Sequence, residues 1–179
     1  MQWLNPPAEW SQEGSTITAR ANADTDFWRK THYGFIRDDG HFFYQEVRGD
    51  FIASVKCTGD YATLYDQAGL MLRENETTWM KCGIEYVGEM QQASCVITRD
   101  YSDWSVVPLP QNPRSIDLRV KRAGGTLEVF YSLDAHDYTM IRTAHLSDSE
   151  TLMVGPMCAA PKGQGFTVTF EDFKIETHS

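Results

Sequence analysis

The chain has 179 residues, of which 41% are hydrophobic and 12% aromatic, and its formal net charge is −9 at pH 7. This composition excludes a disordered chain and is typical of one folded domain, which we expect to span residues 1–179. The acidic balance, without a basic stripe, disfavours nucleic acid and anionic membrane surfaces as partners. No apolar run reaches the length of a membrane-spanning helix.

The N-terminus and the cysteines bear on the compartment. The first residues, Met1 to Pro7, contain neither a basic stretch nor an apolar run of the secretory type, which predicts a cytoplasmic location. Cys57, Cys82, Cys95 and Cys158 are widely spaced, with no CxxC pair and no metal-type grouping. We expect buried free thiols that behave as small hydrophobic side chains. A disulfide is the alternative, and the sequence does not indicate its pairing.

The chain is a succession of short candidate strands. No apolar pattern at helical spacing persists, whereas short runs of Val, Ile, Thr, Phe and Tyr alternate with Gly, Asp, Asn and Pro. This pattern predicts an all-β sandwich or barrel of roughly 11 to 13 strands. In chain order the expected strands are 15–20, 35–39, 41–47, 50–57, 67–73, 79–86, 93–98, 106–107, 116–122, 126–131, 138–142, 153–159 and 166–170. We expect loops at 23–28 and 99–105.

The strands at 67–73 and 79–86 carry the clearest alternation, and a polar turn of about five residues joins them as an antiparallel hairpin. One face is apolar and consists of Ala68, Leu70, Leu72, Met80, Cys82, Ile84 and Tyr86. The opposite face consists of Gln67, Met71, Arg73, Trp79, Lys81 and Glu85. The first face predicts a contribution to the core. The second predicts a binding surface, because polar and aromatic side chains lie close together on it.

This second face has two interpretations. In a binding site, Trp79 with Trp104 or Trp28 offers flat apolar surface that stacks on a sugar ring. Donors and acceptors for hydroxyl groups then come from Gln67, Arg73, Lys81, Glu85 and Asp103. In a purely structural role, the charges form a cross-strand ion-pair ladder, the tryptophans are buried, and Asp103 makes a local turn.

Catalysis is less well supported. A glycosidase needs two carboxyl groups roughly 5–10 Å apart, and the strand at 79–86 offers Glu85 alone on the polar face. Asp66 and Asp103 lie at predicted strand ends and are its candidate partners. The histidines at 32, 41, 136, 145 and 178 lack metal-ligand spacing, and the acids at 24, 26, 38 and 39 match no EF-hand loop. We therefore expect no metal and no cofactor.

Several short motifs occur together in an order typical of one family. They are DQAGLMLR at 66–73, WMKCGIE at 79–85 and SDWS at 102–105, accompanied by Phe27-Trp28, Gly49-Asp50-Phe51 and Ser132-x-Asp134. On these residues the chain resembles an uncharacterised domain family with a concanavalin A-like jelly-roll fold, whose fungal relatives are described as regulators of enolase. The resemblance covers nearly the whole chain. It implies a sandwich of two antiparallel sheets, related to accessory domains of some glycosidases, and no known activity.

The sequence thus favours a cytoplasmic jelly roll that binds a carbohydrate or a similar polar small molecule on its concave sheet without catalysis. A glycoside-processing enzyme that uses Glu85 with Asp66 or Asp103 is the first alternative. A protein-interaction module is the second, and the chain is expected to be a monomer or a homodimer.

Overall fold

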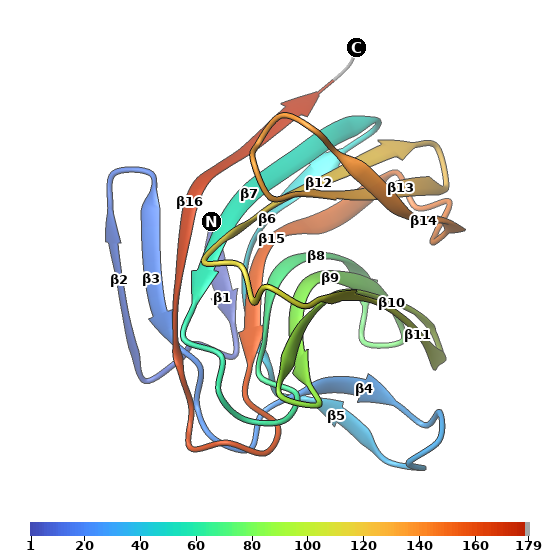
Figure 1. Cartoon of the computed structure of the whole chain (residues 1–179). Helices are drawn as coiled ribbons and strands as arrows, with labels where there is room; N and C mark the ends of the chain where they lie inside the picture. Colours follow the sequence, from blue (N-terminus) through green and yellow to red (C-terminus); the bar gives the residue numbers. More distant parts are fainter. Residues whose placement is uncertain (178–179) are drawn as a thin grey trace.

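The computed structural model describes residues 1–177. In this part of the chain all regular structure is β, arranged as two seven-stranded antiparallel sheets and one two-stranded hairpin (Figure 1). The prediction of an all-β sandwich of two antiparallel sheets is confirmed. Within residues 1–177 the strands number 16 rather than roughly 11 to 13, because three segments that were not predicted as strands pair with neighbouring strands: Gln2–Leu4, Glu9–Glu13 and Phe27–Arg29.

The first sheet carries both strands of the predicted hairpin at its centre. Its order is β1 (Gln2–Leu4), β6 (His41–Arg48), β15 (Thr151–Ala159), β8 (Gln67–Asn75), β9 (Thr78–Val87), β10 (Met90–Arg99) and β11 (Tyr101–Leu109). The order of the second sheet is β14 (Thr139–His145), β13 (Thr126–Ser132), β12 (Ile116–Ala123), β7 (Phe51–Gly59), β16 (Thr167–Thr177), β3 (Thr16–Arg20) and β2 (Glu9–Glu13).

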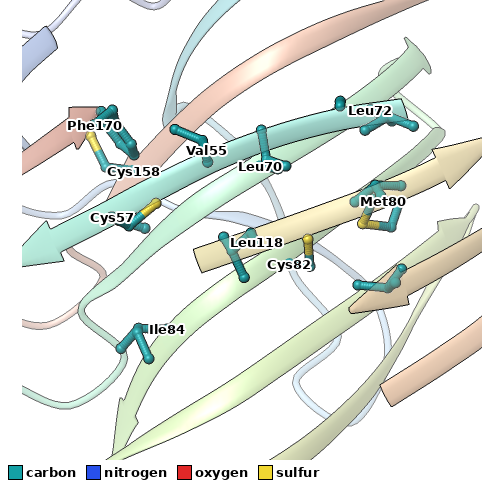
Figure 2. Close-up of a cluster of buried hydrophobic side chains, with 14 of the residues drawn as sticks. Val55, Cys57, Leu70, Leu72, Met80, Cys82, Ile84, Leu118, Cys158 and Phe170 are labelled. Atoms are coloured by element: carbon teal, nitrogen blue, oxygen red, sulfur yellow. The ribbon is translucent and has the colours of Figure 1, made fainter. Parts of the chain in front are cut away.

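The main core lies between the two sheets. From the first sheet it receives the apolar face predicted for the β8–β9 hairpin, including Leu70, Leu72 and Met80, all of which are fully buried. Val55 and Leu118 meet them from the second sheet (Figure 2). The period-two alternation therefore placed the core face correctly, because side chains on a strand point alternately to opposite faces.

A hairpin covers the other face of the first sheet. It consists of β4 (Phe27–Arg29) and β5 (Ile36–Asp38), and we call it the cap hairpin. In Figure 1 it lies against the arched strands β8 to β11, on the side away from β7 and β12. Phe27 and Trp28 pack there in a second apolar cluster with Met71 and Trp79. The prediction of a loop at 23–28 is wrong at Phe27 and Trp28, which are strand residues.

The turns of the first sheet differ from the predicted ones. Thr78 pairs with Asn75, so two residues join β8 to β9 rather than about five, and an irregularity between Arg73 and Asn75 accommodates the difference. The predicted loop at 99–105 is mostly strand β11, because Asp100 adopts a φ of 62° and reverses the chain directly after β10. This tight reversal places Trp104 on a strand.

Two facing glycines set the spacing of β8 and β9. Gly69 pairs with Gly83, and a Cβ atom on Gly69 would lie 1.8 Å from the Cys82 carbonyl oxygen. Any side chain there would force the strands apart. The close approach leaves bare backbone on the capped face of the sheet, between the pair Gln67 and Glu85 on one side and the pair Met71 and Lys81 on the other.

All four cysteines are free and buried, as predicted. Cys82 and Cys95 are cross-strand partners and share the core face. Burial raises the pKa of Cys95 and of Cys158 to about 12, which keeps both thiols protonated at neutral pH.

Candidate ligand-binding site

A cavity of about 330 Å³ opens between the cap hairpin and the first sheet. This volume lies at the lower end of the range for small-ligand pockets. The lining residues are Asp26, Trp28, Tyr33, Phe35, Arg37, Tyr65, Glu85, Trp104, Pro161 and Lys162. Three of them, Trp28, Glu85 and Trp104, belong to the set predicted from the sequence.

Aromatic rings form the walls of the cavity. The Trp28 and Trp104 ring planes are nearly perpendicular, at 89°, with centroids 6.5 Å apart, and Tyr65 meets Trp104 at 80°. Tyr33 packs edge-on against Trp28 and stacks on Phe35. The hydroxyl groups of Tyr33 and Tyr65 share a hydrogen bond of 2.7 Å across the cavity rim. The walls thus present both ring faces and ring edges.

Glu85 provides the buried polar group of the cavity. Its side chain comes from β9 and is only 6% exposed. Ser94 Oγ donates to Glu85 Oε2 at 2.9 Å, and Trp104 Nε1–H donates to Ser94 Oγ at 3.0 Å. Among residues 1–177, no group donates a hydrogen bond to Glu85 Oε1. This oxygen atom is not fully buried and keeps contact with solvent. Glu85 therefore presents one acceptor atom to the cavity.

The pKa of Glu85 is raised above its usual value of 4.5, and burial is the largest cause. The charge of Lys81, the Ser94 hydrogen bond and the nearby Trp104 N–H lower this pKa in part, and the charge of Asp26 raises it. The native state therefore favours the protonated form of this carboxyl group more than the unfolded chain does.

We expect Glu85→Gln to stabilise the protein at neutral pH. Because the folded pKa lies above 4.5, the free energy of unfolding of the natural chain falls as pH rises from 4.5 through the folded pKa. Glutamine keeps an acceptor for Ser94 and removes this loss. Urea unfolding at several pH values should give matching stabilities below pH 4.5 and a difference in favour of the variant that grows above it. A constant difference across this range would contradict the prediction.

Lys81 connects the first sheet to the cap hairpin through hydrogen bonds of its ammonium group. Its ammonium group donates to the Phe27 carbonyl oxygen at 2.7 Å, to Gln67 Oε1, and to Asp26 Oδ1 at 3.4 Å. Gln67 in turn donates to Asp26 Oδ1 at 3.3 Å. The Lys81 side chain is 6% exposed. Its charge is thus directed at the hairpin and away from the cavity.

Arg73 and Trp79 also lie under the cap hairpin. Arg73 forms a two-pronged ion pair with Asp38 of β5, at 2.5 and 2.8 Å. Trp79 is fully buried against Phe27. Neither residue lines the cavity. The cross-strand ion-pair ladder, which was the structural alternative to a binding surface, is also absent from residues 1–177, because Arg73 pairs with Asp38 and Lys81 with Asp26.

The two proposed partners of Glu85 face the other side of the sheet. Asp66 lies two residues before the core residue Ala68, and its Oδ2 accepts from the backbone of Ala62 and Thr63. Asp103 pairs in register with the core residue Ile97, and its carboxylate contacts Arg142 of β14 at 3.1 Å. The carboxylate pairs suggested from the sequence are therefore not assembled.

A second hollow, of about 590 Å³, adjoins the cavity. The two share Trp28, Tyr33 and Trp104, and the second also contacts His32 and Asp103. Asp103 thus lies near the candidate site although its carboxylate is engaged by Arg142.

Sequence reasoning missed the walls that come from the 30–37 segment and from Tyr65. The signal was the run His32-Tyr33-Gly34-Phe35, an aromatic cluster with a glycine between Trp28 and Arg37. Such a run between two short strands is consistent with a hairpin loop. Tyr65 gave no signal, because its position depends on a φ of 68° at a residue two positions before the start of β8.

Residues 1–177 lack two other kinds of functional feature. No cluster of three or more His, Cys, Asp or Glu side chains there is arranged to hold a metal ion, and His178 lies outside the described residues. Within the same residues no helix has the length and apolar character needed to cross a membrane.

The two curved sheets and their shared core define a jelly-roll β-sandwich, here with a capped face that bears a cavity. The fold is similar to that of the carbohydrate-binding module CBM66 from Bacillus subtilis, with a TM-score of 0.64 at 11% identity over 98% of this chain and 95% of that one. The profile of the family described as "Protein of unknown function (DUF1349)" matches residues 3–178, and the chain belongs to this family.

Two comparisons with proteins of Saccharomyces cerevisiae show a higher similarity to the chain than the carbohydrate-binding module does. The chain is 39% identical over 173 residues to "Regulation of enolase protein 1" of Saccharomyces cerevisiae, which covers 97% of this chain and 87% of the yeast protein. A crystal structure of a functionally unknown protein from the same organism superposes with a TM-score of 0.95 at 38% identity, over 99% of this chain and 96% of that one. The family resemblance inferred from the sequence motifs is therefore confirmed.

Proposed function

We propose that the protein binds a small polar molecule, with a carbohydrate as the leading class, in the cavity between the cap hairpin and the first sheet. The observation that carries this proposal is Glu85, a buried carboxylate with one free acceptor atom at the base of an aromatic-walled cavity. A sugar hydroxyl group can donate to this atom while the ring packs on Trp104 or Tyr65.

Backbone strain around the cavity supports the proposal. Tyr65 lies in the left-handed region with a φ of 68°, and Lys30 and His32 adopt φ values of 59° and 64° beside the lining residue Tyr33. Non-glycine residues in this region each cost of order 1–3 kcal/mol, and they also occur in turns away from the cavity, such as Glu89, Asn112 and Asp172. Strained residues on two separate segments thus position the Tyr33 and Tyr65 hydroxyl groups.

The jelly-roll likeness to a carbohydrate-binding module agrees with the same class of ligand, although at 11% identity it concerns the fold alone. The proposal contains no catalytic step. Glu85 lacks the carboxylate partners considered from the sequence, since Asp66 and Asp103 face the core side. A cytoplasmic location is part of the proposal, and the four free thiols support it because such thiols are typical of reducing compartments.

We expect Trp104→Ala to weaken ligand binding by at least about tenfold, since a ring stack and its buried apolar area are worth more than about 1.4 kcal/mol. Calorimetric titration of a panel of monosaccharides and disaccharides measures the effect. Trp10→Ala is the matched control, because this indole is 44% exposed and contacts Trp3 and Phe43, away from the cavity. Equal losses in the two variants would remove the cavity as the binding site.

An interaction module is a second candidate, favoured by exposed apolar side chains at the rim of the cavity. Tyr33, Phe35 and Ile36 on the cap hairpin are 45%, 41% and 50% exposed. A second copy of the chain or another protein could cover them. Sedimentation analysis at increasing concentration decides between monomer and homodimer, and Phe35→Ser should abolish association if this rim mediates it.

A further inference from the structure

The nearby cation Lys81 donates no hydrogen bond to the free oxygen atom Oε1 of Glu85. An ammonium group has three protons to donate. Lys81 directs its protons to the Phe27 carbonyl oxygen, Gln67 and Asp26. It lowers the pKa of Glu85 through its charge but forms no hydrogen bond with it. The carboxylate therefore lacks a direct ionic partner within residues 1–177.

Arg37, a second cation of the lining, is likewise engaged. Its guanidinium group pairs with Asp39 at 2.8 Å and with Asp24 at 3.0 Å. These hydrogen bonds raise the pKa of Arg37. Lys162 remains, and its side chain is at the exposed rim. The lining and its ion partners thus hold one more acid than base: Asp24, Asp26, Asp39 and Glu85 against Arg37, Lys81 and Lys162.

The aromatic walls of the cavity also favour a positively charged ligand. The face of a tryptophan or tyrosine ring attracts a cation within about 6 Å of its centre, and the attraction grows when the site is desolvated. Trp28 and Trp104 stand at 89° to each other, and Tyr65 stands at 80° to Trp104. Both pairs are edge contacts between the rings, so the cavity wall presents ring edges together with the ring faces that attract a cation. With Glu85 beneath them they have the composition of a cage for an organic cation.

We propose that the ligand of this cavity carries a protonated amine, which pairs with Glu85 Oε1 while its ring or carbon skeleton packs on Trp28, Tyr65 and Trp104. The inference rests on the proposed binding function and narrows it to a cationic small molecule, an amino sugar within the carbohydrate class. A neutral hydroxyl group supplies a hydrogen bond but leaves the buried negative charge uncompensated. An anionic ligand meets Glu85 and Asp26 and is disfavoured.

Three sugars that share one ring test the inference: glucosamine, glucose and N-acetylglucosamine, which carry an ammonium, a hydroxyl and a neutral amide group at the same carbon. Calorimetric titration is done at a pH where the free amine is protonated. We expect glucosamine to bind at least about tenfold tighter than the other two, consistent with one charge-assisted hydrogen bond. In Glu85→Gln this preference disappears, while glucose affinity changes less.

A second variant tests whether the electrostatic potential in the cavity favours a cation. Lys162→Met removes an exposed rim cation and leaves the packed interior unchanged, so the protein folds normally. It is expected to strengthen glucosamine binding more than glucose binding, because the removed charge repels only the cationic sugar. An unchanged or weaker glucosamine affinity contradicts the inference.

The outcomes separate this inference from the proposed function. If glucosamine and glucose bind with equal affinity, the inference of a protonated amine is overturned, and the proposed carbohydrate site is retained. A glucosamine preference that persists in Glu85→Gln also overturns it. Tetramethylammonium is the fourth probe, a cation without hydroxyl groups. If it binds in a Glu85-dependent manner and none of the sugars do, the cavity is a cation site, but the protonated amine and the carbohydrate class are both overturned, because tetramethylammonium has no N–H to donate. If none of the four probes binds, both are overturned.

Discussion

Replacing Lys81 by methionine is expected to lower the free energy of unfolding by about 3 kcal/mol, because removal of one partner from a buried ion pair leaves uncompensated polar groups behind. Asp26, whose side chain is 13% exposed, loses its cation, and the Phe27 carbonyl oxygen and Gln67 Oε1 lose their donor. Methionine fills a similar volume, so the change is electrostatic rather than steric. Urea-induced unfolding measures it.

Lys30→Met is the matched control for this prediction. Lys30 also forms an ion pair, with Asp100 at 2.7 Å, but the two side chains are 33% and 50% exposed. Surface pairs of this kind contribute about 0–1 kcal/mol. The double variant Asp26→Asn with Lys81→Met should recover part of the loss, since position 26 then carries no unpaired charge. If the two lysine replacements cost the same, Lys81 does not fasten the cap hairpin.

Trp79→Ala is expected to cost about 3–5 kcal/mol, the usual cost of removing a large aromatic side chain from a packed interior. Trp79 is fully buried, in contact with the cap hairpin through Phe27 and with Lys81 positioned 5.8 Å from its ring centre. The loss should appear in thermal and urea unfolding. It should also raise amide hydrogen exchange at Phe27 and Arg29, which the cavity left by the indole would loosen.

Trp79→Phe separates packing from hydrogen bonding. The indole Nε1 of Trp79 is buried and has no partner among residues 1–177, so phenylalanine removes no hydrogen bond and should cost clearly less than alanine. A sugar platform would behave differently: Trp79→Ala would then abolish binding with little loss of stability. That result would return Trp79 to the ligand site and contradict the arrangement described above.

Period-two alternation predicted the fold because each sheet has one face on a shared core. It placed Leu70, Leu72 and Met80 in that core and grouped Gln67, Arg73, Lys81 and Glu85 on the opposite face. It could not predict what covers the opposite face. Residues on β8 and β9 are buried on both sides, and the covering element is a short hairpin whose strands have three residues each. Segments of this length carry almost no periodic signal.

The same limit explains the candidate site. Glu85, Trp28 and Trp104 were predicted and line the cavity, whereas Arg73 and Trp79 were predicted and lie beneath the hairpin. Residue type alone does not separate these groups, because a buried ion pair and a ligand contact use the same side chains. The partners Asp38 and Asp26 decide the matter, and they lie 35 residues before Arg73 and 55 residues before Lys81 in the chain.

The facing pair Gly69 and Gly83 has a consequence for how proteins of this design diverge. A side chain at either position would collide with the backbone of the neighbouring strand. Gln67 and Lys81, one on each side of the pair, are hydrogen-bonded to each other and to Asp26, directly before the cap hairpin. We therefore expect the residues at the floor of the site to tolerate few substitutions. The 30–37 segment and the stretch that ends at Tyr65 carry no such constraint, so we expect relatives to acquire different ligands by exchanging these two segments over an unchanged sheet.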